Sequence, residues 1–214
     1  MHSFHSFHKT QLNQHSHLLN PRLQELHLPM VVLENFLTST KEISVQELEY
    51  VPYQRLVLAH LLDEECGGSL KKVLVETLHD RATGALEIST PPDLNKDDLI
   101  KISTAVSHLV GLPNFDSMSG KYYACFDVKD TDNSDSYLRQ AYRLFTLHTD
   151  GTYVEETTDW VLMLKLKEVN AEGGESRLLH LDDWEEMEIF AEHPLGQTPI
   201  EYTSPPSKNV SVSV

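Results

Sequence analysis

The three residues His148-Thr149-Asp150 have the types and the spacing best suited to chemistry in this chain. They lie at the end of a run over residues 142–148 that predicts a β-strand, and alternate residues of a strand point to the same side. An imidazole and a carboxylate on one side are two of the three ligands in the two-histidine, one-carboxylate arrangement. That arrangement holds Fe(II) and leaves positions open for oxygen and a co-substrate.

The same spacing occurs again in His180-Leu181-Asp182, so His-x-Asp alone is weak evidence for a metal site. We interpret the second motif as structural, with Asp182 capping a helix over residues 183–192 and His180 ending a strand over 176–180. A structural interpretation stays open for the first motif as well. The β-like runs around His148, and the absence of a helix start at Asp150, favour the metal interpretation there.

Composition excludes several classes of protein. The 214 residues include 33 acidic and 17 basic side chains, for a formal net charge of −16. This balance argues against nucleic acid and against an anionic membrane surface as partners. Two cysteines cannot build a disulfide framework, and no apolar run approaches the ~20 residues that span a bilayer. Residues 1–19 lack the apolar stretch of a secretory signal, so we expect a soluble cytoplasmic protein.

The elements that must position these residues change in character along the chain. Apolar periodicity predicts helices over residues 54–64, 69–81 and 97–110, with a short strand over 85–89. Strand-like runs follow over residues 122–129, 142–148, 160–166 and 176–180. Helices first and strands later predict an α+β fold with an antiparallel sandwich or jelly roll. Cys125 is expected to be buried in the first of these later strands.

Five of the twelve histidines lie in residues 1–20, which contain no acidic residue. We expect a flexible, His-rich polar tail there. His2, His5 and His8 are spaced three apart, so a loose metal site is the alternative if this segment is helical.

A family resemblance is carried by NFDSMSGKYYACF, by LHTDGTYVEE around His148, and by GGESRLLHLDDWE. These stretches resemble the carbon-starvation-induced family of glutarate 2-hydroxylases, which are Fe(II)- and 2-oxoglutarate-dependent dioxygenases related to the taurine dioxygenase group. The likeness runs from about Glu47 onward. It implies a clavaminate synthase-like jelly roll, the double-stranded β-helix, with His148 and Asp150 as iron ligands.

The resemblance also implies a reaction and its partners. Glutarate would be hydroxylated at carbon 2 in lysine degradation, while 2-oxoglutarate and molecular oxygen give succinate and carbon dioxide. The full-length family protein would be a possible homo-oligomer. The family's Gly-Gly-x-Thr/Ser stretch falls here on Ser176, whose hydroxyl would contact 2-oxoglutarate; a turn followed by an ordinary strand serine is the alternative. Arg139 and Arg143 flank the iron-ligand strand and suit a dicarboxylate substrate, although solvated or ion-paired arginines are the alternative.

The family places a second histidine and an arginine well downstream, and the histidines after Asp150, His180 and His193, match neither. We therefore expect residues 21–214 to be the N-terminal two-thirds of a single dioxygenase domain, incomplete at the C-terminus. We also expect an isolated chain that is poorly soluble or partly folded, and inactive. The alternatives are a non-catalytic jelly-roll remnant serving as a binding or oligomerisation module, and a related hydroxylase for another small carboxylate.

Overall fold

A computed structural model describes residues 12–115, 120–127, 146–150, 157–169 and 175–199. The chain divides into two compact units. Unit 1 contains Met1–Phe115 and Leu162–Leu166, and unit 2 contains Asp116–Val161 and Lys167–Val214.

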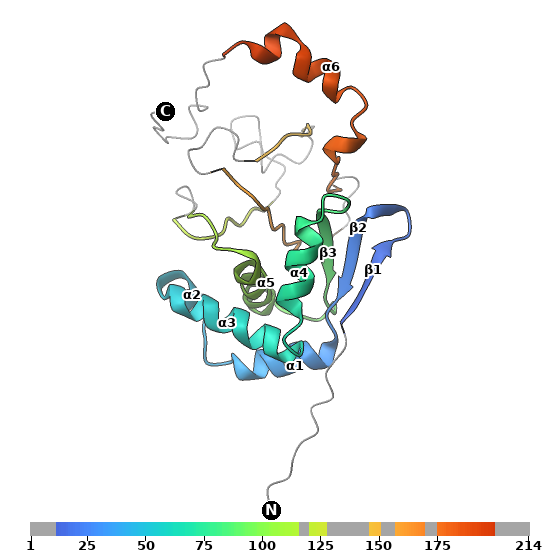
Figure 1. Ribbon diagram of the computed structural model, residues 1–214. Helices are drawn as coiled ribbons and strands as arrows, with labels where there is room; N and C mark the ends of the chain where they lie inside the picture. The colour runs from blue at the N-terminus through green and yellow to red at the C-terminus, as the bar shows by residue number, and fades with distance from the viewer. Residues whose placement is uncertain (1–11, 116–119, 128–145, 151–156, 170–174, 200–214) are drawn as a thin grey trace, which may run out of the picture. The chain divides into compact units, whose positions relative to one another are not determined.

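Unit 1 contains a three-stranded sheet in the order β1-β2-β3 (Figure 1). Strands β1 (Asn13–His17) and β2 (Asn20–His27) form an antiparallel hairpin, in which His15 lies opposite Glu25. Strand β3 (Ala85–Ser89) pairs parallel with β2. Parallel neighbours need a long connection between them, and four helices supply it here.

The helices of unit 1 pack on one another and on the sheet. Helix α3 contacts α5 and α1, and α4 contacts both α5 and β3 (Figure 1). Their bounds are Met30–Ser39 for α1, Val45–Tyr50 for α2, Pro52–Glu65 for α3, Leu70–His79 for α4 and Lys96–Val110 for α5.

Side chains fix where several of these helices begin. Ser44 and Glu47 form a capping box before α2, in which the Ser44 hydroxyl accepts from the Glu47 N–H at 3.1 Å and the Glu47 carboxylate accepts from the Ser44 N–H at 2.9 Å. Asn95 caps α5 by accepting from the Asp98 N–H at 3.0 Å. Gly68, with φ of 71°, turns the chain between α3 and α4, a conformation that glycine adopts without strain.

The core of unit 1 is apolar apart from a few paired polar groups. Lys101 of α5 is only 8% exposed, and its Nζ donates to the Thr40 carbonyl at 2.8 Å. That carbonyl closes the C-terminus of α1, and it also accepts from the Ile43 N–H at 3.0 Å. The largest fully buried side chains include Phe36, Leu26, Leu28, Leu33, Leu48, Leu58, Leu62, Leu70 and Leu74.

The sequence-based elements of unit 1 are confirmed where apolar periodicity was strong. The helices predicted over 54–64, 69–81 and 97–110 are α3, α4 and α5, and the strand predicted over 85–89 is β3. Helices α1 and α2 were not predicted.

The flexible tail predicted over residues 1–20 is wrong where the structure describes that segment. Asn13–His17 form β1, and β2 begins at Asn20. Cross-strand pairs of polar side chains, such as His15 and Glu25, stabilise this hairpin. The polar composition of the segment, taken alone, predicted a flexible tail. His2, His5 and His8, and with them the alternative metal site, lie outside the described residues.

The described part of unit 2 contains the 3₁₀ helices Leu181–Asp183 and Pro194–Gln197 and the helix α6 (Met187–Glu192). No strand occurs in the described portions of the runs predicted over 122–129, 142–148, 160–166 and 176–180. Alternation shows that a segment suits a sheet, whereas a strand exists only with a hydrogen-bonded neighbour. The double-stranded β-helix stays a prediction.

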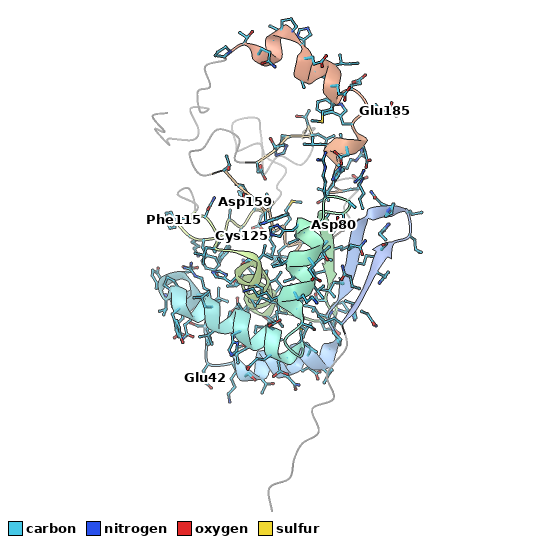
Figure 2. All side chains as sticks on the ribbon, viewed as in Figure 1. Glu42, Asp80, Phe115, Cys125, Asp159 and Glu185 are labelled. Atoms are coloured by element: carbon cyan, nitrogen blue, oxygen red, sulfur yellow. The ribbon has the colours of Figure 1, made fainter. Side chains whose placement is uncertain are left out.

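Two further expectations concern the burial of Cys125 and the presence of membrane-spanning helices. Cys125 is exposed, so its predicted burial in a strand is wrong (Figure 2). In the ranges that the structure describes, no helix is both long enough and apolar enough to cross a bilayer.

We predict that Lys101→Ala lowers the free energy of unfolding of unit 1 by about 1–3 kcal/mol, because a buried charge-assisted hydrogen bond and the packed lysine stem are both lost. Urea unfolding followed by circular dichroism measures the change. Lys96→Ala on the exposed side of the same helix is the control, with an expected change within about 0.5 kcal/mol. Equal effects of the two substitutions would contradict the structural role of Lys101.

His108 predicts an acid-sensitive step in the stability of unit 1. Burial lowers the pKa of this histidine below its ordinary 6.5, and the nearby positive charge of Arg55 lowers it further. The Thr104 carbonyl, which accepts from His108 Nδ1 at 2.9 Å, acts in the opposite direction and raises this pKa in part. As the pH drops, this histidine is therefore protonated in the unfolded chain at a higher pH than in the folded chain. The free energy of unfolding consequently falls as the pH drops below about 6.5.

Urea unfolding between neutral pH and about pH 5 checks this step. His108→Gln should remove part of the loss, whereas His60→Gln, at a position whose side chain is 70% exposed, should retain it. A pH dependence that is identical in wild type and His108→Gln would contradict the assignment.

Candidate metal centre

The structure brings His148 and Asp150 together. His148 Nε2 lies 3.4 Å from Asp150 Oδ1, and the two side chains are 43% and 57% exposed. The chain at 146–149 is not assigned to a strand, so this contact is a local one and does not lie on a sheet face. Both groups remain accessible to an ion from solvent.

A backbone contact fixes which ring nitrogen of His148 donates a hydrogen bond. The Nδ1 atom of its ring lies 2.8 Å from the Thr146 carbonyl oxygen. A carbonyl only accepts, so Nδ1 must donate, and a neutral ring then carries its lone pair on Nε2. This is the form in which a histidine binds a metal through Nε2.

The same arrangement tests whether a cation fits. His148 Nε2 and a carboxylate oxygen of Asp150 lie 3.4 Å apart, and in the neutral ring that nitrogen carries a lone pair. A divalent cation accepts nitrogen and oxygen ligands of these two kinds. The donor set therefore fits one imidazole and one carboxylate ligand of an iron site.

The second His-x-Asp motif is arranged in the opposite way. His180 Nδ1 accepts from the Asp182 N–H at 3.1 Å, so the neutral ring carries its proton on Nε2. His180 thereby caps the 3₁₀ helix Leu181–Asp183. The prediction that Asp182 caps a helix starting at residue 183 is wrong, because the histidine ring supplies the cap and α6 begins only at Met187.

The remaining predicted site residues are less well defined. Ser176 is exposed and lies in a described segment without strand assignment, so its contact with 2-oxoglutarate stays a prediction. Arg139 and Arg143 lie outside the described residues. Arg177, which sequence reasoning passed over, lies beside Ser176 and reaches the Glu175 carboxylate at 3.8 Å.

The other metal-binding residue types add no complete site. Across the described ranges, no group of three or more His, Cys, Asp or Glu side chains is arranged to hold a metal ion. Cys66 is fully buried, and burial, with the nearby charges of Asp63 and Glu65, raises the pKa of its thiol to about 12. This thiol stays protonated and is a poor ligand and nucleophile.

Comparison with known proteins decides the family. The family model described as CsiD matches residues 12–214. The chain belongs to the CsiD family. A glutarate 2-hydroxylase of Citrobacter koseri is 50% identical to this CsiD chain over 198 residues, which cover 91% of the chain and 61% of the relative. The resemblance seen in the sequence is confirmed, and it extends upstream of Glu47 to residue 12.

The two His-x-Asp motifs provide a matched test of metal binding. We predict that His148→Ala weakens binding of Mn²⁺, used as a probe for Fe(II), by about tenfold or more, since even residues that only support a ligand cost that much. His180→Ala should leave the affinity unchanged, because its ring caps a helix.

Titration followed by the electron paramagnetic resonance of free Mn²⁺ measures both affinities. Asp150→Asn and Asp182→Asn repeat the comparison for the carboxylates. Equal losses at the two motifs, or no loss at the first, would contradict the assignment of His148 and Asp150.

Proposed function

We propose that this CsiD chain contributes the iron-binding part of an Fe(II)- and 2-oxoglutarate-dependent dioxygenase that hydroxylates glutarate at carbon 2. The products would be 2-hydroxyglutarate, succinate and carbon dioxide. The single observation that carries the proposal is the 50% identity to a protein named glutarate 2-hydroxylase. The chain spans 61% of that relative's length, so the activity of the whole relative comes to this chain as a proposal.

The pair His148 and Asp150 supports the iron part of the proposal. Fe(II) and 2-oxoglutarate, when bound, supply the oxidising chemistry with molecular oxygen. His148 Nε2 and the Asp150 carboxylate would hold the metal, while the Thr146 carbonyl keeps the imidazole in its ligand form. The 57% exposure of the Asp150 side chain leaves room for small co-substrates to approach.

Three further side chains would recognise carboxylates. The Ser176 hydroxyl would donate a hydrogen bond to 2-oxoglutarate, and the guanidinium groups of Arg139 and Arg143 would pair with the substrate dicarboxylate. The positive charge matters here because the chain carries a formal net charge of −16 and both ligands are dianions.

We propose a double-stranded β-helix as the scaffold of this site and the cytoplasm as its location. CsiD family membership and the alternating apolar runs after residue 120 support the scaffold. Two free cysteines, Cys66 and Cys125, support a reducing compartment.

A second candidate function is a non-catalytic binding or oligomerisation module. It is favoured by the metal-ligand count, because the described residues bring together two ligands and not three.

Succinate release tests the two candidates against each other. We extend the chain with the segment of the Citrobacter koseri relative that it does not match, and supply Fe(II), 2-oxoglutarate and oxygen. The extended protein should form succinate and 2-hydroxyglutarate in equal amounts only when glutarate is present. The 214-residue chain alone should show background turnover.

Matched variants make the result interpretable. In the extended protein, His148→Ala should reduce succinate formation to background, and His180→Ala should retain most of it. Stimulation by another small carboxylate instead of glutarate would change the substrate assignment. A folded extended protein that binds Mn²⁺ but never forms succinate would favour the binding module.

A further inference from the structure

The first His-x-Asp motif ends in a pair of residues that occurs once in the chain. Of the nine glycines in the sequence, only Gly151 follows an aspartate, and none follows an asparagine. An aspartate side chain is short enough to reach the main-chain nitrogen atoms next to it. Glycine has no Cβ to shield its nitrogen or to restrict rotation of the backbone. The sequence therefore joins the Asp150 carboxyl group to an unshielded amide nitrogen.

The described surroundings of Asp150 hold its side chain only weakly. The side chain is 57% exposed, and its contact with His148 Nε2 at 3.4 Å is long for a hydrogen bond. Asp150 lies in a turn, and residues 146–149 before it belong to neither a helix nor a strand. Residues 146–150 thus lack the helical or sheet hydrogen bonding that keeps a main chain in one conformation.

The second His-x-Asp motif differs in both respects. Asp182 is followed by Asp183, which has a Cβ and whose N–H donates to the His180 carbonyl at 2.9 Å. These residues lie in the 3₁₀ helix Leu181–Asp183, and the side chain of Asp182 is 34% exposed. Both the Cβ and the hydrogen bond hinder attack by the Asp183 nitrogen on the Asp182 carboxyl group.

Ring closure at the first motif is a balanced reaction. With the Asp150 carboxyl group in its acid form, the main-chain nitrogen of Gly151 bonds to Asp150 Cγ and one Cγ–O bond breaks. The departing oxygen leaves as water with the acid proton and the amide proton. The product is a five-membered succinimide. Reactions between two groups of the same molecule are fast when the groups are held close together.

Water then opens the succinimide at one of its two carbonyl carbons. Attack at Cγ restores aspartate, whereas attack at the main-chain carbonyl carbon gives isoaspartate. In isoaspartate the peptide bond to the next residue runs through Cγ, so the main chain gains one carbon and the free carboxylate stands directly on Cα. The two steps release and consume one water molecule, need neither oxidant nor reductant, and leave the mass of the chain unchanged.

We propose that Asp150 is a site of spontaneous isoaspartate formation, and that a metal ion bound by His148 and Asp150 prevents it. Conversion moves the carboxylate away from its position 3.4 Å from His148 Nε2, so it separates the two ligands. Coordination fixes the carboxylate in one orientation, whereas ring closure requires the carboxyl group to turn towards the main chain. The conversion is independent of the proposed function, and the protection rests on it.

Metal occupancy thereby determines how long the site survives. A chain that keeps its ion retains aspartate at position 150. A chain that loses its ion accumulates a form in which the carboxylate has one methylene less reach, and this form no longer offers the ligand pair. The loss of the ion then becomes irreversible with time.

Incubation of the 214-residue chain at neutral pH with a chelator tests the conversion. Peptide mapping measures it, because isoaspartate resists an Asp-specific protease and accepts a methyl group from an isoaspartyl methyltransferase. We expect isoaspartate to accumulate at Asp150 and to stay at background at Asp182. Gly151→Ala should slow the accumulation at least about tenfold, because a Cβ hinders the attacking nitrogen and restricts the backbone. Gly111→Ala is the matched control, since a Cβ there meets no atom within 4 Å.

The same incubation with Mn²⁺ in place of the chelator tests the protection. The rate of accumulation should fall in proportion to the fraction of chain that holds Mn²⁺. No isoaspartate at Asp150, or equal amounts at Asp150 and Asp182, would overturn the conversion and leave the proposed function untouched. An unchanged rate in the Mn²⁺-bound chain would overturn the protection and contradict the assignment of Asp150 as a metal ligand.

Discussion

The hydrogen bond from His148 Nδ1 to the Thr146 carbonyl, at 2.8 Å, is the contact on which the candidate site depends. It places the lone pair of the neutral ring on Nε2, and Nε2 faces the Asp150 carboxylate at 3.4 Å. Without that contact the ring could carry its proton on Nε2 and act as a donor to the carboxylate. Binding of a metal ion through Nε2 would then require a change of tautomer first.

Local backbone groups sort the histidines of this chain into two chemical kinds. His148 and His108 donate from Nδ1 to a carbonyl oxygen. His17, His180 and His193 accept at Nδ1 from the N–H two residues ahead, and so they cap turns and short helices. The two His-x-Asp motifs therefore share a spacing and differ in the tautomer of the neutral ring, because the direction of one hydrogen bond differs.

The sequence predicted three helices and the short strand of unit 1 well, and the pairing of the N-terminal hairpin poorly. Strong periodicity and clear stop signals located α3, α4, β3 and α5. A helix or short strand that buries one face shows this in the spacing of apolar residues within its own segment. The β1–β2 hairpin was missed, because His15 and Glu25 stabilise each other only after the strands meet. The spacing of His148 and Asp150 singled them out as candidate ligands, whereas the tautomer of His148 needed the position of the Thr146 carbonyl.

The central claim is that His148, and not His180, is poised to bind a divalent metal. Long-range proton–nitrogen NMR of the histidine rings reads the tautomers directly, and Mn²⁺ broadens the signals of any ring it approaches. We expect His148 to carry its ring proton on Nδ1 and to lose its Nε2 signal first as Mn²⁺ is added. We also expect His180 to carry its proton on Nε2 and to keep its signals. A proton on Nε2 of His148, or earlier broadening at His180, would contradict the claim.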